Sequence, residues 1–274
     1  MLGDIPNSFA RGNAVHDSFA RVITIHGVHF LTVEQNVGYR VQGHNFFVED
    51  GIETHNIIRN NLAISSLTVT NMLQTDISVA SFWVTNPTND FYGNHAAGGD
   101  FYGIWYEIKT NPDGPSATLD VCPTGNPLGY VANNVAHSNI RFGLRIFILA
   151  SRLYPCQPVR NDSNADDPWH YNPSIPAIFS NFTIYKNLED GVLAEQVGNV
   201  IFYNFTVAEN YHSGFEYFTA NFTKEPPTIN NSAIIGKSTG YASADGTNYT
   251  TGMSAIITSR SGSHNLTNIR IYNY

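Results

Sequence analysis

A repeat of 23 residues is the feature of this sequence that most restricts its fold. Residues 181–187 read NFTIYKN and are followed by Gly at 191, and residues 204–210 read NFTVAEN and are followed by Gly at 214, so every matched position is offset by 23. The pattern of Asn followed by Gly four residues later also occurs at Asn139 and Asn94. Asn139 lies 48 residues before Asn187, and Asn94 lies 45 residues before Asn139, in each case close to two periods. Self-similarity at this period is typical of repeat architectures.

The repeat is built from short β-rich runs, and helix patterns are scarce. The clearest runs are 22–25, 30–33, 66–69, 82–84, 102–108, 142–149, 178–185, 200–207 and 269–272. We therefore predict an all-β chain, a single right-handed, single-stranded parallel β-helix (solenoid) over residues 1–274. Like residues should lie above one another in neighbouring coils, with Asn187 over Asn210. A β-sandwich would instead show hairpins every 8–12 residues, and few tight Asn-Gly or Asp-Gly hairpin turns occur.

Two stretches, 110–127 and 154–176, are rich in Pro, Asn and Asp, and we expect both to be loops that leave the solenoid. Each contains one cysteine, Cys122 or Cys156. A disulfide between them would close a loop of about 35 residues and stabilise the fold by about 4 kcal/mol. The alternative is two buried free thiols. Neither cysteine has a second Cys or a His at metal-ligand spacing.

Composition excludes two classes of partner for this segment. The formal charge is -8, and 14 Lys and Arg are spread along the chain, so no basic stripe is available for nucleic acid. No apolar run approaches the roughly 20 residues of a membrane span. Because strand-like pattern begins at once, we expect the chain to be a piece of a longer polypeptide, whose adjoining modules, or further copies of the chain, would cover the ends of the helix.

Acceptor motifs for N-linked glycans favour an extracellular or cell-surface location. The seven Asn-x-Ser/Thr sequons are Asn161, Asn181, Asn204, Asn221, Asn230, Asn248 and Asn265. All lie in the second half of the chain, which predicts a glycoprotein carrying N-linked glycans.

Several short motifs resemble the family that contains fibrocystin-L and the cell-migration-inducing hyaluronidases. They are RVITIHG at 21–27, NVGY at 36–39, GHNFFVEDGIE at 43–53, SFWVTNP at 81–87 and NVAHSN at 134–139. The resemblance implies a right-handed β-helix within a large extracellular or membrane-anchored protein. The long insertion of the hyaluronidase branch is missing between Ala63 and Ser81, which places the chain nearer to the fibrocystin-L branch.

The densest group of chemically active side chains is His44, Glu49, Asp50 and Glu53. Two carboxyls beside a histidine could divide the acid and base roles of glycosidic cleavage. The same oxygens could hold calcium. The structural alternative is a turn in which His44 and Asp50 are hydrogen-bonded to neighbouring coils. Other polar side chains expected on nearby coils are Arg21, His26 and His95, which are more often structural when they occur singly.

Aromatic side chains offer a second candidate surface. Phe101, Tyr102, Tyr106, Trp83 and Trp105 could stack on sugar rings or could fill the core. Trp169, in a polar loop, is the better candidate for an exposed contact.

The sequence predicts a structural or adhesive segment of an extracellular cell-surface glycoprotein, part of a surface coat or filament. The rival is a polysaccharide-cleaving enzyme, a hyaluronan-type glycosidase. Two carboxyls about 5–9 Å apart in an open groove would favour cleavage, and the same carboxyls buried beneath a turn would favour a scaffold.

Overall fold

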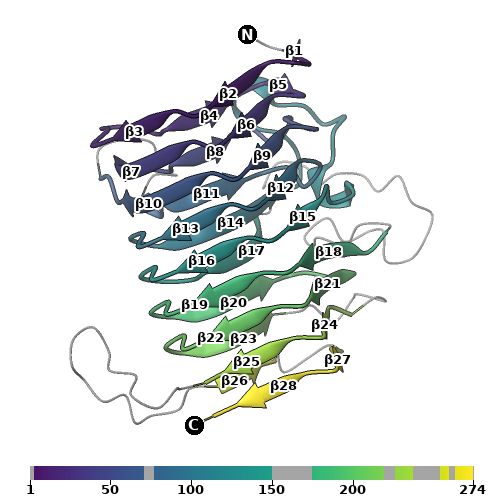
Figure 1. Ribbon diagram of the computed structural model, residues 1–274. Helices are drawn as coiled ribbons and strands as arrows, with labels where there is room; N and C mark the ends of the chain where they lie inside the picture. The colour runs from purple at the N-terminus through teal and green to yellow at the C-terminus, as the bar shows by residue number, and fades with distance from the viewer. Residues whose placement is uncertain are drawn as a thin grey trace.

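The computed structural model describes residues 3–70, 77–149, 175–218, 226–236, 254–258 and 263–273. The chain winds into a right-handed parallel β-helix whose coils follow one another from the N-terminal end to the C-terminal end (Figure 1). Every strand pair within the three long sheets is parallel, and each strand pairs with the equivalent strand of the next coil. The predicted all-β solenoid is therefore confirmed.

Each of the first eight coils contributes one strand to each of three sheets, named here in chain order, and the last described coil contributes to sheets 1 and 2. Sheet 1 contains β2 (Phe9–Arg11), β6 (Thr32–Glu34), β9 (Ile57–Arg59), β12 (Asp90–Tyr92), β15 (Val131–Ala132), β18 (Ala177–Ser180), β21 (Val200–Tyr203), β24 (Thr228–Asn230) and β27 (Asn265–Thr267). Sheet 2 contains β3 (Ala14–His16), β7 (Val37–Gln42), β10 (Leu62–Leu67), β13 (His95–Ala97), β16 (Val135–His137), β19 (Thr183–Tyr185), β22 (Thr206–Ala208), β25 (Ala233–Ile235) and β28 (Arg270–Tyr272). Sheet 3 contains β4 (Ile23–Ile25), β8 (Phe46–Val48), β11 (Ala80–Val84), β14 (Tyr102–Lys109), β17 (Leu144–Leu149), β20 (Asp190–Glu195), β23 (Ser213–Phe218) and β26 (Ser254–Ile257). A further pair, β1 (Gly3–Asp4) with β5 (Val28–His29), lies at the N-terminal end.

The core is a continuous apolar bore enclosed by the three sheets. Alternate side chains of each short strand point inward, so strand register places one apolar side chain above the next. In sheet 1 this column runs through Val33, Ile58, Phe91, Val131, Phe179, Phe202 and Ile229, all of them buried. Burial of each large apolar side chain stabilises the fold by about 1.5–3 kcal/mol.

The corner between sheets 1 and 2 has the same geometry in every coil. It consists of two residues, and the first has a left-handed backbone conformation with φ between 51° and 68°. These first residues are Gly12, Gln35, Asn60, Gly93, Asn133, Asn181, Asn204, Asn231 and Asn268. Gly and Asn are the residue types that tolerate this conformation best.

The second corner residue points toward the bore and forms a ladder of amides in the first five coils. The ladder consists of Asn13, Asn36, Asn61, Asn94 and Asn134. From Asn36 onward, each side-chain oxygen accepts from the backbone N–H and the side-chain amide of the Asn in the coil before it, as Asn61 Oδ1 does from Asn36 at 3.1 and 2.9 Å. In the next two coils Phe182 and Phe205 replace the amides and stack with ring centroids 4.9 Å apart.

A second amide ladder occupies the corner between sheets 2 and 3. Asn210 Oδ1 accepts from the backbone N–H of Asn187 at 3.1 Å and from its side-chain amide at 2.8 Å. Asn187 bonds to Asn139 in the same way. The predicted stacking of Asn187 over Asn210 is thus confirmed.

The corners before and after sheet 3 both vary in length and hold the insertions. Residues 110–130 join β14 to β15 and contain two 3-10 turns, η2 (Gly114–Ser116) and η3 (Pro123–Gly125), but no strand. Most of the second expected loop, 154–174, lies outside the described residues, as does Trp169. In the described part of the chain, no helix has the length and apolar character needed to cross a membrane.

We expect Asn61→Ala to lower the free energy of unfolding by about 2–4 kcal/mol. The substitution leaves the buried backbone N–H of Asn36 and the carbonyl of Val33 without their side-chain partners, and each unsatisfied buried group costs about 1–3 kcal/mol. Urea unfolding followed by tryptophan fluorescence measures the effect.

Asn265→Ala is the matched control, because Asn265 is exposed and, within the described residues, its side-chain amide makes a single 3.5 Å bond, to Thr228. It should change stability by less than about 0.5 kcal/mol. Equal effects of the two substitutions would contradict a stabilising role for the ladder.

Candidate functional site

A cluster of charged side chains lies where two neighbouring strands of sheet 3 end. His26 directly follows β4, and Glu49 and Asp50 directly follow β8. The register of these strands pairs Ile25 with Val48, so His26 and Glu49 are neighbours on adjacent coils. The next residue in each case is a glycine with positive φ, Gly27 at 60° and Gly51 at 91°, which turns the chain toward sheet 1.

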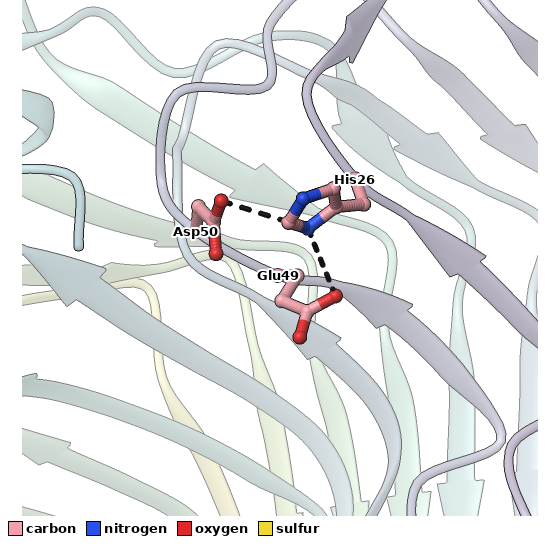
Figure 2. Close-up of side chains that lie close together, drawn as sticks. All are labelled: His26, Glu49 and Asp50. Carbon is pink, nitrogen blue, oxygen red and sulfur yellow. Dashed lines mark hydrogen bonds and ion pairs between the residues drawn. The ribbon is translucent and has the colours of Figure 1, made fainter. Parts of the chain in front are cut away.

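Figure 2 shows the His26 imidazole between two carboxylates. Its Nδ1 atom lies 3.1 Å from Glu49 Oε2 and 3.5 Å from Asp50 Oδ2. The other oxygen of Glu49, Oε1, lies 3.8 Å from Arg21 Nη1. The side chains of His26 and Glu49 are 34% and 25% exposed, whereas that of Asp50 is 3% exposed. One side of the cluster is therefore open to solvent and the other is closed.

Glu53 lies under this turn and stabilises its backbone. Its carboxylate accepts hydrogen bonds from the backbone N–H groups of Gly27, Gly51 and Asp50 at 2.8, 2.9 and 3.3 Å. Burial raises the pKa of Glu53, while hydrogen bonds from the backbone N–H groups of Gly27, Asp50 and Glu53 itself oppose the rise. A carboxyl with this many backbone donors holds the corner in shape.

His44 lies apart from the three carboxylates, at the opposite end of β8. It is fully buried, and its Nδ1 accepts a hydrogen bond of 2.9 Å from the backbone N–H of Ala80. Its ring stacks on Phe47 and meets the edge of Trp83. The four residues grouped by sequence thus divide into a packed histidine and a carboxylate turn, and their catalytic role stays a prediction.

The outer face of sheet 3 carries an aromatic and charged column. Successive coils place Phe47, Trp83, Trp105 and Arg145 above one another. Arg145 lies 5.0 Å from the Trp105 ring centre, and its guanidinium donates to Glu195 Oε2 at 2.8 and 3.0 Å. Of the aromatic side chains considered from the sequence, Tyr106 belongs to the bore, whereas Trp83, Tyr102 and Trp105 form a buried outer cluster with Phe101 packed against it.

Glu107 is a buried carboxyl on this outer face. It lies on β14 between the bore residues Tyr106 and Ile108, so its side chain points outward. Among the described residues neither of its oxygens has a hydrogen-bond partner, and η3 contacts the same strand. Burial raises the pKa of Glu107 to about 7, and the positive charges of Lys109 and Arg145 limit the rise.

A second group of one histidine and two carboxylates lies along β20 and β23 of the same sheet, with Asp190 at the start of β20, His212 directly before β23 and Glu216 within β23. Asp190 Oδ1 accepts from His212 Nδ1 at 2.8 Å and from Ser213 Oγ at 2.7 Å. Glu216 Oε2 lies 3.6 Å from the same imidazole nitrogen. Burial raises the pKa of Glu216 to about 7, and Asp190 adds to the rise. The donors His212 and Ser213 therefore already satisfy Asp190 Oδ1.

The sequons fall on several parts of the solenoid. Asn181 and Asn204 occupy the exposed left-handed corner, where Asn204 Nδ2 donates to Asn181 Oδ1 at 2.7 Å. Asn265 is exposed and Asn230 is half-buried. Asn161, Asn221 and Asn248 lie outside the described residues, as does Cys156. Glycosylation, and the pairing of Cys122 with Cys156, therefore stay predictions.

Sequence reasoning found part of this arrangement and missed the rest. It named His26 only as a secondary candidate, because His26 and Glu49 are 23 residues apart and become neighbours only through the register of β4 and β8. It did not name Glu107, although a single carboxylate within the apolar run 102–108 is a detectable signal. It also missed His212, whose partners come from two strands.

Comparison with known proteins agrees with this architecture. The sequence profile described as CEMIP beta-helix matches residues 1–144, slightly more than half of the 274 residues. The chain belongs to the CEMIP beta-helix family. The matched segment of this CEMIP beta-helix protein includes β4 and β8, the residues His26, Glu49 and Asp50 that follow them, and Glu107.

Individual relatives include members of two branches. The chain is 40% identical to mouse (Mus musculus) fibrocystin-L and 39% identical to the human (Homo sapiens) protein, over 79% of its own length in each case. It is 30% identical to human cell surface hyaluronidase CEMIP2 over 74% of its length. It spans only 5% of fibrocystin-L and 17% of CEMIP2, so it corresponds to a small part of either relative.

We expect Glu107→Gln to abolish one component of the pH dependence of folding in this CEMIP beta-helix protein. The pKa of Glu107 is about 7 in the folded protein, against 4.5 for an unperturbed Glu such as that of the unfolded chain. Between these two pH values the folded state therefore holds a proton that the unfolded state has released. Stability should therefore fall as pH rises from about 4.5 to 7, by up to about 3 kcal/mol from this group. The variant should match the wild type at pH 4 and exceed it at pH 8.

Urea unfolding at a series of pH values measures this difference, with the exposed Asp120→Asn as the control. A slope from Glu216 and Glu53 should persist in the Gln variant, because burial raises both pKa values in the same direction. Parallel pH profiles of wild type and Glu107→Gln would show that Glu107 is ionised in the folded protein at pH 5.

Proposed function

We propose that this chain is a structural segment of an extracellular cell-surface glycoprotein, in which the β-helix acts as a rigid spacer between adjoining modules. The observation that carries the proposal is the continuity of the solenoid. The bore column of sheet 1 and the corner amides extend from coil to coil, and the carboxylate of Glu53 braces a turn. A stack of this kind resists bending because each coil bonds to its neighbours along three sheets.

The relatives support the location. Human CEMIP2 is named a cell surface hyaluronidase. The exposed sequons Asn181, Asn204 and Asn265 are compatible with attached glycans, since none of them is buried in the core.

The surface of the last described coil supports contact with a further module or a second copy of the chain. Leu266 and Ile271 occupy bore-facing positions of β27 and β28, below Ile229 and Ile234. They are 50% and 58% exposed, whereas Ile229 and Ile234 are buried. Apolar side chains and unpaired strand edges favour coverage by another β coil.

Cleavage of a hyaluronan-like polysaccharide is the second candidate, favoured by the hyaluronidases among the relatives. Glycosidases need two reachable carboxyls, separated by about 5–9.5 Å, that flank the sugar bond. Here Glu53 is held by three backbone donors and Glu107 is covered, so Glu49 is the most accessible of the carboxyls grouped in the sequence at 49–53. This geometry favours the structural role.

Incubation of the purified chain with size-defined hyaluronan, with and without Ca²⁺, tests the proposal. Gel electrophoresis of the polymer should show no change in its size, and small-angle X-ray scattering should show an elongated rigid particle. If the wild-type chain shortens hyaluronan and the Glu49→Gln variant leaves it at full length, the enzymatic role would instead be established. The exposed Asp120→Asn serves as the control.

A further inference from the structure

We propose that His26, Glu49 and Asp50 form a binding site for a divalent transition-metal ion of the zinc class. The proposal does not depend on the structural role suggested above, since metal binding would be compatible with either candidate function. It rests on the mutual distances of three ligand atoms, on the chemistry of the donor set and on a buried carboxylate oxygen without a hydrogen bond.

The three ligand atoms already have nearly the separations that a metal ion requires. Zinc binds His nitrogen and carboxylate oxygen at about 2.0–2.2 Å in tetrahedral geometry, so neighbouring ligand atoms are about 3.3–3.5 Å apart. His26 Nδ1 lies 3.1 Å from Glu49 Oε2 and 3.5 Å from Asp50 Oδ2, and all three atoms lie within 4.8 Å of one another. Only a small approach of the two carboxylates would complete one face of a tetrahedron.

Hydrogen bonding alone leaves this cluster incompletely satisfied. The Nδ1 atom of His26 can carry one proton, and the Glu49 oxygen at 3.1 Å is the closer acceptor. The side chain of Asp50 is only 3% exposed, and its Oδ2 atom has no hydrogen-bond donor among the described residues. A buried carboxylate oxygen without a donor is costly. A cation between the three side chains would satisfy both carboxylates at once (Figure 2).

The cluster of His26, Glu49 and Asp50 is closed on the side of Asp50 and open to solvent on the side of His26 and Glu49. The insertion at 110–130 covers Asp50, because the backbone N–H of Asp113 donates to the Asp50 carbonyl at 3.0 Å. Gly114 approaches so closely that a Cβ atom there would lie 2.7 Å from Asp50 Oδ1. His26 and Glu49 remain partly exposed, so a solvent molecule could supply the fourth ligand. Arg21 contacts Glu49 Oε1 and leaves Oε2 directed at the imidazole.

The donor set selects among metals. Calcium takes six to eight oxygen ligands and has little affinity for imidazole, whereas zinc, nickel and copper bind imidazole readily. Three ligands that include one imidazole therefore fit a zinc-class ion better than the calcium considered from the sequence. The group at Asp190, His212 and Glu216 has similar composition, but Asp190 Oδ1 already accepts two hydrogen bonds.

Isothermal titration of the metal-free chain with ZnCl₂, and separately with CaCl₂, tests the site. We expect one saturable zinc site per chain, a higher melting temperature in the presence of zinc, and no comparable response to calcium. His26→Gln and Asp50→Asn should weaken zinc binding at least 10-fold. Co²⁺ bound in place of zinc should show the strong visible absorption of tetrahedral coordination, and His26→Gln should abolish it.

His212→Gln and His16→Gln are the matched controls, because each removes an imidazole that contacts a carboxylate elsewhere. Both should keep wild-type zinc affinity. His26 is partly exposed, so His26→Gln should fold normally, and its melting temperature without zinc checks this. Absence of saturable zinc binding, wild-type affinity in His26→Gln, or an equal loss in His212→Gln would overturn the proposal.

Discussion

The stacking of one coil on the next, in register and at the strand spacing of a parallel sheet, is the constraint on which the rest of the structure depends. At about 4.8 Å per coil, a short corner must repeat its backbone conformation from coil to coil, or the strands on either side of it could not stay in register. The two-residue corner between sheets 1 and 2 meets this requirement with a left-handed residue in every coil. The amide that follows is buried and finds its partners in the coils above and below, so Asn36 and Asn61 stabilise each other only within a stack.

The same constraint explains why the charged cluster lies at the corner that follows sheet 3. The corner between sheets 1 and 2 has no room for extra residues, because its backbone and side chains are bonded to both neighbouring coils. The corner after sheet 3 accepts turns of different lengths, including the insertion at 110–130. It can therefore carry residues such as Asp50, which is not part of either amide ladder, together with the segment at 110–130 that covers it. The regular corner between sheets 1 and 2 provides rigidity, and the corner after sheet 3, whose length varies, provides chemistry.

The outer face of sheet 3 shows a related effect of covering segments. A solenoid sheet has one face on the bore and one face toward solvent, yet the outward side chains of β14 are buried as deeply as the inward ones, with the exception of Lys109. Aromatic rings surround Arg145, which is compensated by Glu195, whereas Glu107 has no comparable partner. The raised pKa of Glu107 follows from this difference, because a carboxyl that loses its hydration without gaining donors favours its protonated form.

The sequence by itself determined the solenoid. A 23-residue offset, short β-rich runs and recurring Asn at matched positions were enough to place Asn187 over Asn210, since each coil repeats one local pattern and its inward side chains need a like neighbour. Only the tertiary structure decided which charged residues meet. His44 and Glu49 are five residues apart, yet lie at opposite ends of β8, while His26 and Glu49 are 23 apart and lie 3.1 Å from each other. Winding the chain brings residues one period apart to adjacent rungs, and an extended strand separates those that are close in sequence.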